Sequence, residues 1–249
     1  MQTGPTVKVD HYEVLAAEPD HAGYAYKGLP ILATSGTHEF AAEAISELVP
    51  PGASILELGA GTGALSLRLA DAGFDVTAVD YVAANYRAEH ENIEFRSLDL
   101  NADFLTGCEG EFDAVVAVEI IEHLENPRHL IRKAFALLKP GGTVLVTTPN
   151  INNPKSLAEF VWTGRFALFL PRHYEKDGHI NPVPWFVLQD ALDEAGFETV
   201  EVSSFKSGVR SIKGLMGFLI QCFGWKNRAP RGQKLAAFAN KPSDRELSA

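Results

Sequence analysis

Two carboxylates and an imidazole stand close together in the middle of the chain, at Glu119, Glu122 and His123. If a helical turn begins after Glu119, all three side chains share one face, because residues three and four apart are neighbours on a helix. Carboxylate oxygens with an imidazole nitrogen suit Mg²⁺, Mn²⁺ or Fe²⁺ better than an ion that prefers thiolates. The motif therefore predicts part of a metal site, for which His179 would supply a fourth ligand, with His173 as the nearby substitute.

Two other interpretations of these residues stay open. In the first, His123 or His179 alone is the general base for a hydroxyl, since the pKa of a histidine lies close to neutral pH. In the second, Glu122 and His123 face solvent, and Glu119 contacts a cofactor through its backbone.

A glycine-rich, acidic turn at residues 57–63 (ELGAGTG) follows an apolar run and opens a helical pattern. Glycines let the chain turn tightly there and bring backbone amides close to a nucleotide-like ligand. A second strand pattern ends about 20 residues later in Asp80, whose carboxylate can accept both hydroxyls of a ribose. No Walker-type lysine follows the glycines. Glu57 therefore favours a cationic cofactor.

These motifs resemble those of the class I S-adenosylmethionine-dependent methyltransferases, over roughly residues 37–242. The resemblance implies that Tyr81 lies against the adenine, that the Asp99 carboxylate takes the adenine amino group, and that the next amide, at Leu100, meets the ring. The cofactor-binding residues that it implies are Glu57, Gly59, Ala60, Gly61, Gly63, Asp80, Tyr81, Asp99, Leu100 and Glu119.

The order Glu-x-x-Glu-His, then Thr-Pro-Asn at residues 148–150, then a histidine resembles two families of metal-dependent O-methyltransferases. One methylates polyprenyl catechols in ubiquinone synthesis, and the other methylates the terminal 2′-hydroxyl of small RNAs. The resemblance implies that Mg²⁺ or Mn²⁺ binds adjacent oxygens of a diol or catechol. The ligands that it implies are Glu119, Glu122, His123 and His179, and the candidate catalytic residues are His123 and His179.

Alternating strand and helix patterns predict the framework that positions these residues. The expected fold is α/β: a doubly wound, seven-stranded, mostly parallel sheet of the Rossmann-like methyltransferase type, with ligands at the carboxyl ends of the strands. Apolar spacing at Phe40, Ala44, Ile45 and Leu48 predicts an opening helix. Further helices are expected at 64–72, 127–138 and 184–195, and strands at 53–56, 74–79, 93–96, 112–119, 143–147, 197–205 and 235–239. The resemblance to methyltransferases implies that the last strand runs antiparallel and completes the sheet of seven.

We expect an N-terminal cap segment at residues 1–36, the methyltransferase domain at 37–242, and a polar tail at 243–249. An insertion at 151–183 follows the fifth strand, and its residues 155–174 are rich in apolar side chains. Together with a second apolar patch at residues 216–225, it favours a lid, a membrane-contacting surface or a dimer interface, with ordinary core packing as the alternative.

Composition limits the class of protein. The chain has 249 residues, 46% of them hydrophobic, and a formal net charge of -10. The acidic balance disfavours a nucleic-acid substrate, although a local basic patch around Arg228, Arg231 and Lys234 stays open. Two distant cysteines, Cys108 and Cys222, indicate neither a disulfide framework nor a thiolate zinc site. Neither a signal peptide nor a transmembrane stretch is expected, which indicates the cytoplasm.

The preferred function is methylation of a hydroxyl on a small or lipid-like acceptor. The alternatives are an NAD-dependent oxidoreductase, which would use the same glycines and Asp80, and a non-catalytic cofactor-binding scaffold. The sequence leaves open the identity of the acceptor, the need for a metal and the oligomeric state.

Overall fold

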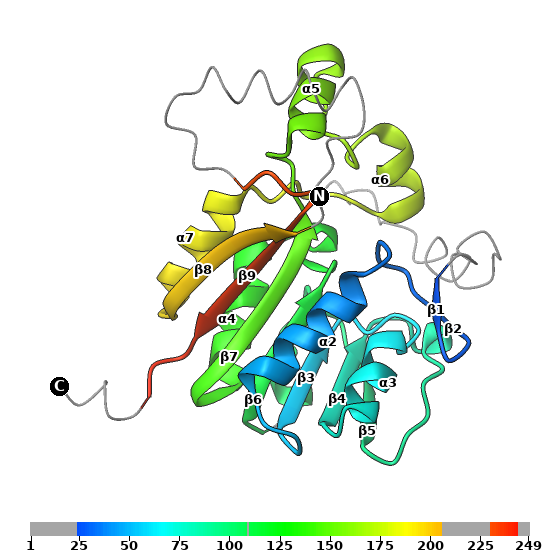
Figure 1. Ribbon diagram of the computed structural model, residues 1–249, viewed down its shortest axis with the longest axis vertical. Helices are drawn as coiled ribbons and strands as arrows, with labels where there is room; N and C mark the ends of the chain where they lie inside the picture. Colours follow the sequence, from blue (N-terminus) through cyan, green and yellow to red (C-terminus); the bar gives the residue numbers. More distant parts are fainter. Residues whose placement is uncertain (1–23, 109, 206–229, 244–249) are drawn as a thin grey trace, which may run out of the picture.

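The predicted seven-stranded, mostly parallel sheet is confirmed by a computed structural model, which describes residues 24–108, 110–205 and 230–243 (Figure 1). The strand order is β5-β4-β3-β6-β7-β9-β8. Only β9 runs antiparallel to its neighbours, β7 and β8. The strands are β3 (Ser54–Leu58), β4 (Asp75–Asp80), β5 (Ile93–Ser97), β6 (Phe112–Val118), β7 (Leu138–Pro149), β8 (Glu198–Phe205) and β9 (Lys234–Asn240).

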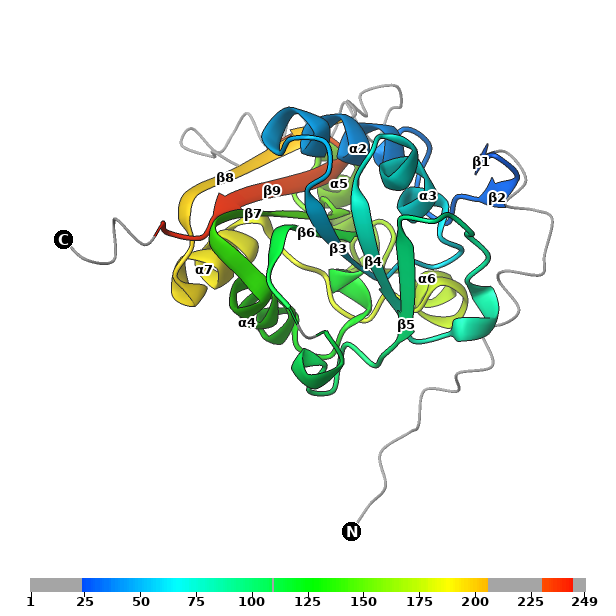
Figure 2. The same ribbon diagram turned by 90° about the horizontal axis from the view of Figure 1, so that it is seen from below.

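Helices cover both faces of this sheet, with α2 and α3 on one face and α4 and α7 on the other (Figure 2). The helices are α2 (Thr37–Leu48), α3 (Ala64–Asp71), α4 (Pro127–Leu137), α5 (Pro154–Thr163), α6 (Pro171–Asp177) and α7 (Trp185–Ala195). Single 3₁₀ turns lie at η2 (Ala83–Asn85), η3 (Leu105–Gly107) and η4 (Ile121–His123), and a small hairpin pairs β1 (Ala25–Tyr26) with β2 (Leu29–Pro30).

The hydrophobic core divides into two layers on either side of the sheet. In β7, Val144 and Val146 pack with the residues of α4 and α7, whereas Leu145 packs with those of α2 and α3. This alternation follows from the pleat of a strand, which points successive side chains to opposite faces. The same alternation continues to the end of β7, where the polar residues Thr147 and Thr148 lie.

Helix ends follow the expected chemistry. Asn126 caps α4 by accepting a hydrogen bond from the His129 amide at 3.1 Å, and Pro127 is the first helical residue. Gly196 ends α7 with a φ of 96°, in the left-handed region that favours glycine. Both boundaries were predicted from the sequence.

Two expectations differ in detail. The buried face of α2 contains Ala41, Ala42 and Ile45, whereas Leu48 is half exposed because it lies in the last turn, beyond the edge of the sheet's core. β7 begins at Leu138, not at residue 143, so residues 139–142, which lie between the predicted helix and the predicted strand, belong to the strand. The reason is that the backbone after β9 extends the ladder: the Gly141 amide donates to Lys241 and the Lys241 amide to Gly142.

Several predictions concern residues that the structure does not describe. These are most of the cap segment, the apolar patch at 216–225, Cys222, Arg228 and all but the first residue of the tail. Among the helices that are described, none is both long and apolar enough to span a bilayer.

Candidate functional site

The glycine turn occupies the carboxyl end of β3, as expected. The amides of Gly59 and Ala60 donate to the Val79 carbonyl at 2.8 and 3.0 Å, which ties the turn to β4. Gly59 and Gly63 have φ values of 82° and 84°. A Cβ at Gly59 would lie 2.6 Å from the Ile120 side chain, and one at Gly63 would lie 2.5 Å from the Cβ of Ala88. Both positions therefore require glycine, for conformation and for space.

Asp80 ends β4 beside this turn. Its two carboxylate oxygens accept hydrogen bonds from the amides of Gly61 at 2.8 Å and Val82 at 2.9 Å. Burial raises the pKa of Asp80, and these backbone bonds oppose the rise. The carboxylate thus already fixes the shape of the turn, and its contact with a ribose stays a prediction.

Glu57 lies behind the turn and belongs to the buried layer next to α3. It is 2% exposed and accepts a hydrogen bond from the Ser66 hydroxyl at 2.5 Å. Burial raises the pKa of Glu57 to about 8, so the carboxyl is mainly neutral at neutral pH. An approaching cation would favour its ionised form.

The residues expected around the adenine lie at the ends of β4 and β5. Tyr81 is 53% exposed, Asp99 is exposed and accepts from the Asn101 amide at 2.9 Å, and Leu100 is buried. Their positions at the same edge as the glycine turn suit one extended ligand, and the individual contacts stay predictions.

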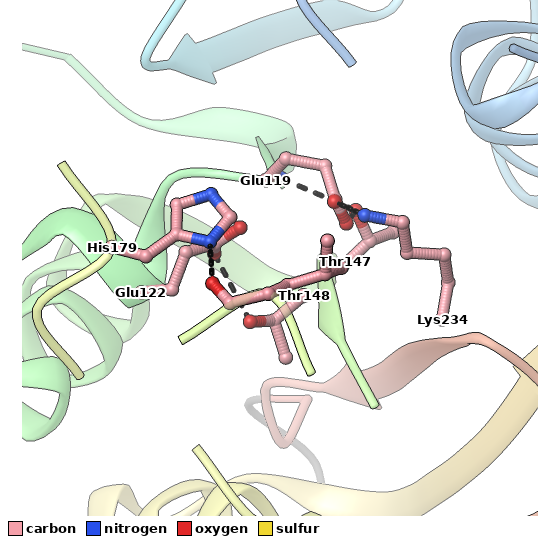
Figure 3. A network of polar contacts seen from close by, with 7 residues as sticks. Glu119, Glu122, Thr147, Thr148, His179 and Lys234 are labelled. Carbon is pink, nitrogen blue, oxygen red and sulfur yellow. Dashed lines mark hydrogen bonds and ion pairs between the residues drawn. The ribbon is translucent and has the colours of Figure 1, made fainter. Parts of the chain in front are cut away.

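A second group of candidate residues lies at the same edge of the sheet, at the carboxyl end of β6. The helical turn predicted after Glu119 forms η4 there. The structure brings together Glu122, His123 and His179, each offering a ligand atom, with all three atoms within 4.8 Å of one another. Figure 3 shows two of them, Glu122 and His179, side by side. The two imidazole rings are 4.9 Å apart and nearly perpendicular. Glu122 is fully buried, so the interpretation in which it faces solvent is wrong.

Backbone hydrogen bonds bring His179 to this cluster across 56 residues of sequence. The amides of Ile180 and Asn181 donate to the Glu122 carbonyl at 3.1 and 2.9 Å, and the Asn181 side chain donates to the Leu124 carbonyl. His179 itself donates from Nδ1 to the Leu168 carbonyl at 2.7 Å. Because Nδ1 carries the proton, the lone pair is on Nε2.

Burial sets the charges of the cluster. It raises the pKa of Glu122 well above the usual range, an effect that the Glu119 carboxylate reinforces. It lowers the pKa of His123 to about 3 and lowers that of His179 too, so both rings are neutral at neutral pH. Neutral imidazoles are the form that binds metals and accepts protons.

The Glu122 carboxyl has one oxygen with a partner and one without. Oε2 accepts from the Thr148 hydroxyl at 3.0 Å, whereas Oε1 is buried and has no hydrogen bond within the described ranges. A buried polar atom without a partner is costly, and a cation at this position would satisfy it. The residues present therefore fit a divalent ion with one carboxylate and two imidazole ligands.

Glu119 does not join this cluster, so the predicted set of four is assembled only in part. Its carboxylate forms an ion pair with Lys234 of β9 and accepts from the Thr147 hydroxyl at 3.2 Å (Figure 3). Thr147 and Thr148 point to opposite faces of the sheet, and each binds a different glutamate. The pleat of β7 therefore separates the two carboxylates.

Two further expectations need correction. Lys234 is only 4% exposed, so it is not part of a surface basic patch. His173, the substitute ligand, lies outside the cluster: its Nδ1 accepts from the Leu170 amide at 3.3 Å, and its ring centroid is 6.3 Å from that of His179.

Sequence reasoning missed the roles of Thr147, Thr148 and Lys234. Thr147 ends the predicted fifth strand and Thr148 begins the Thr-Pro-Asn motif, but neither hydroxyl had an assigned partner. The signal at Lys234 was a charged residue at the start of an otherwise apolar strand pattern, where burial requires a counter-charge.

The insertion after β7 contributes to the cluster on one side and is exposed on the other. Leu168 has a φ of 66°, which is unusual for a residue with a side chain and places its carbonyl on His179. The Phe169 ring lies 5.4 Å from that of His179. On α5, Phe160, Val161 and Trp162 are 44%, 68% and 81% exposed.

Comparison with known proteins gives a family. A family model described as a methyltransferase domain matches residues 34–202. A ubiquinone biosynthesis O-methyltransferase from Bordetella avium is 33% identical over 49% of this chain and 53% of its own length. One of the same name from Xanthomonas axonopodis pv. citri is 31% identical over 79% of this chain and 80% of its own length. The chain thus spans about half of the length of the former relative and most of that of the latter.

Solved structures with this fold support the same assignment. A SAM-dependent methyltransferase from Archaeoglobus fulgidus is similar with a TM-score of 0.58 at 17% identity, over 92% of this chain and 99% of the other. Haemonchus contortus phosphoethanolamine N-methyltransferase 2, in complex with S-adenosyl-L-methionine, has a TM-score of 0.61 at 16% identity, over 98% of this chain and 62% of the other. The glycine turn, the sheet order and these matches weigh against the NAD-dependent oxidoreductase. The chain belongs to the methyltransferase-domain family and has the class I S-adenosylmethionine-dependent methyltransferase fold.

Proposed function

We propose that this protein transfers the methyl group of S-adenosylmethionine to a hydroxyl oxygen of a small or lipid-like acceptor. The observation that carries the proposal is the buried cluster of Glu122, His123 and His179 at the same sheet edge as the glycine turn. In the reaction the acceptor oxygen attacks the methyl carbon, an O–C bond forms and the C–S bond breaks. The hydroxyl proton is released, and S-adenosylhomocysteine leaves.

Alignment and deprotonation are what such a reaction asks of a protein, because the sulfonium is already activated. The turn at residues 57–63 and Asp80 would hold the nucleoside at the ends of β3 and β4. The cluster at the end of β6 would hold the acceptor oxygen. The two reactants would then lie side by side, because the strand ends that hold them are adjacent.

Glu122, His123 and His179 would be the ligands of a divalent ion, Mg²⁺ or Mn²⁺. Such an ion supplies a Lewis acid that lowers the pKa of a bound hydroxyl and orients two adjacent oxygens. The support is the match between the donor set, the buried Glu122 Oε1 and the neutral imidazoles. Thr148, Leu168 and Asn181 orient these ligands through hydrogen bonds.

A second route to deprotonation uses the same residues without an ion. The His179 Nε2 lone pair, fixed by the Nδ1 hydrogen bond to Leu168, would accept the hydroxyl proton directly. The lowered pKa keeps this ring unprotonated at neutral pH, although it also makes the ring a weaker base. The His123 ring is the neighbouring candidate.

The apolar insertion supports an acceptor with an apolar part. Phe160, Val161 and Trp162 on α5 are exposed, while Leu168 and Phe169 contact His179 within the same insertion. The insertion would thus cover the acceptor and carry the exposed face to a membrane surface that supplies it. A homodimer through the same face is the competing use.

A methyl-transfer assay with acceptors of graded chemistry tests the proposal. We would supply labelled S-adenosylmethionine with a prenylated catechol, its mono-O-methyl ether and the corresponding monophenol, each with Mn²⁺ or with EDTA. Preferred transfer to the catechol, lost in EDTA, is the expected result. Equal transfer to the monophenol in EDTA would favour the histidine route. Transfer to none of these hydroxyls would contradict the proposal.

A further inference from the structure

Lys234 is a buried cation beside the proposed ion site. It begins β9 and is paired in register with Pro149 of β7 and Phe205 of β8. The Lys234 and Glu119 side chains are only 5% and 10% exposed, and their ammonium and carboxylate form an ion pair. Lysine is almost never buried to this extent without a partner. The ion pair therefore lies in the interior of the fold and not at its surface.

Neighbouring hydrogen bonds hold both members of the pair. On one side, Thr147 binds the Glu119 carboxylate. On the other, the Asn150 side chain donates to the carbonyls of Pro230 and Gly232 at 2.7 Å each, and its amide donates to the Gln233 carbonyl at 2.9 Å. These bonds fix the segment from which Lys234 extends.

The backbone at Glu119 also directs its side chain to this partner. Glu119 has a φ of 53°, in the left-handed region, which is unfavourable for a residue with a side chain. The Glu119 amide donates to the Thr147 carbonyl at 3.1 Å, which holds this conformation at the end of β6. The carboxylate is consequently on the Thr147 side of β7, and the Glu122 carboxylate is on the Thr148 side.

We propose that Lys234 is a positioning residue that keeps Glu119 out of the ion's ligand set, so that the ion site of this chain has three protein ligands. This inference rests on the proposed function. For Glu119 to bind the ion as Glu122 would, its carboxylate would have to turn away from Lys234, which is 4% exposed, and a buried charge without its partner is strongly destabilising. The position that Glu119 would otherwise fill is then left for an acceptor oxygen.

The test measures Mn²⁺ affinity by calorimetry in protein saturated with S-adenosylhomocysteine. The test variants are Glu119→Gln, Lys234→Met and the double variant. Glu122→Gln is the reference for loss of a ligand. Lys241→Met, on the segment after β9, is the matched control for loss of a lysine. We expect Glu119→Gln to change the affinity less than about three-fold and Glu122→Gln to weaken it at least about 100-fold. Lys234→Met should strengthen it about ten-fold, and the double variant should return to the wild-type value.

Lys234→Arg keeps the charge and guards against a folding defect in Lys234→Met. We expect it to retain wild-type Mn²⁺ affinity. In EDTA, each single loss of charge should lower the melting temperature by roughly 10 °C, and the double variant should lose less than the sum. If the losses of melting temperature in the two single variants simply add in the double variant, Glu119 and Lys234 do not interact, and the proposal is overturned.

The other outcomes separate this inference from the proposed function. Equal losses in Glu119→Gln and Glu122→Gln would make Glu119 a ligand and overturn the inference, while the metal-assisted reaction would stand. Failure of Lys234→Met to gain affinity would overturn the role of Lys234. If the nucleoside saturates every protein and Mn²⁺ binds to none, the inference fails and the histidine route stands. Failure of the nucleoside to bind would overturn the proposed function and the inference with it.

Discussion

The two halves of the sheet edge are built in different ways. The half at β3 and β4 consists of a continuous turn held by backbone amides, Gly59 to Val79 and Gly61 to Asp80. The half at β6, β7 and β9 consists of side chains from distant segments, such as Glu122 with His179 and Glu119 with Lys234. The first half depends on local conformation, and the second on the assembled fold.

The largest effect should come from breaking the backbone half at Gly63. A Gly63→Ala change places a Cβ 2.5 Å from Ala88 and 2.8 Å from Tyr86, at a φ of 84°. We expect saturable binding of S-adenosylhomocysteine to be lost, as measured by calorimetry. Gly164→Ala is the matched control, because its φ is 74° and its Cβ meets nothing within 4 Å. Equal loss in both would show that strain, not the close approach, is responsible.

Glu57 makes the backbone half sensitive to pH. Its folded pKa is raised from 4.5 to about 8, so the folded state binds more protons than the unfolded state between these values. Stability should therefore fall as pH rises across this window, by as much as about 5 kcal/mol, and level off above it. Urea unfolding at pH 5, 6.5 and 8 measures this slope. The Glu57→Gln variant should have a shallower slope, and an unchanged slope would contradict the assignment.

Asn181 tests the assembled half without touching a proposed ligand. Asn181→Ala removes the side-chain bond to the Leu124 carbonyl that helps to hold the His179 segment. We expect Mn²⁺ affinity to fall about ten-fold, the scale for residues that orient ligands, with nucleoside binding unchanged. Asn101→Ala, which loses a bond to the Glu125 amide nearby, is the control. A parallel fall in nucleoside binding would mean that the two halves are not separable.

The smallest effect is expected on the outer face of α5. Trp162 is 81% exposed, and a Trp162→Ser change removes an apolar anchor from the proposed membrane surface. Binding to vesicles of anionic and neutral lipids, measured by sedimentation, should weaken about three-fold. Phe186→Ser on α7 is the control for an exposed aromatic residue elsewhere. If the Trp162→Ser and Phe186→Ser variants bind vesicles equally well, and only Trp162→Ser changes the oligomeric state, the outer face of α5 is a dimer interface.

The same contrast explains what the sequence could predict. The strands of the sheet, the caps at Asn126 and Gly196 and the glycine turn follow from local patterns, whereas the antiparallel direction of the last strand was implied by the resemblance to methyltransferases. The spacing of Glu122 and His123 was also a local signal, and His179 was predicted as a further ligand. The Glu119–Lys234 pair could not be predicted, because it depends on strand register between β7 and β9 and on which face Thr147 takes.

The most direct test of the account is a calorimetric titration of Mn²⁺ into wild-type protein saturated with S-adenosylhomocysteine, beside a Glu122→Gln variant and an exposed control, Glu125→Gln. The account predicts about one ion per chain in the wild type and in the control, and loss of that binding in Glu122→Gln while the nucleoside still binds. Binding that survives in Glu122→Gln, or none in the wild type, would contradict a metal centre at Glu122, His123 and His179.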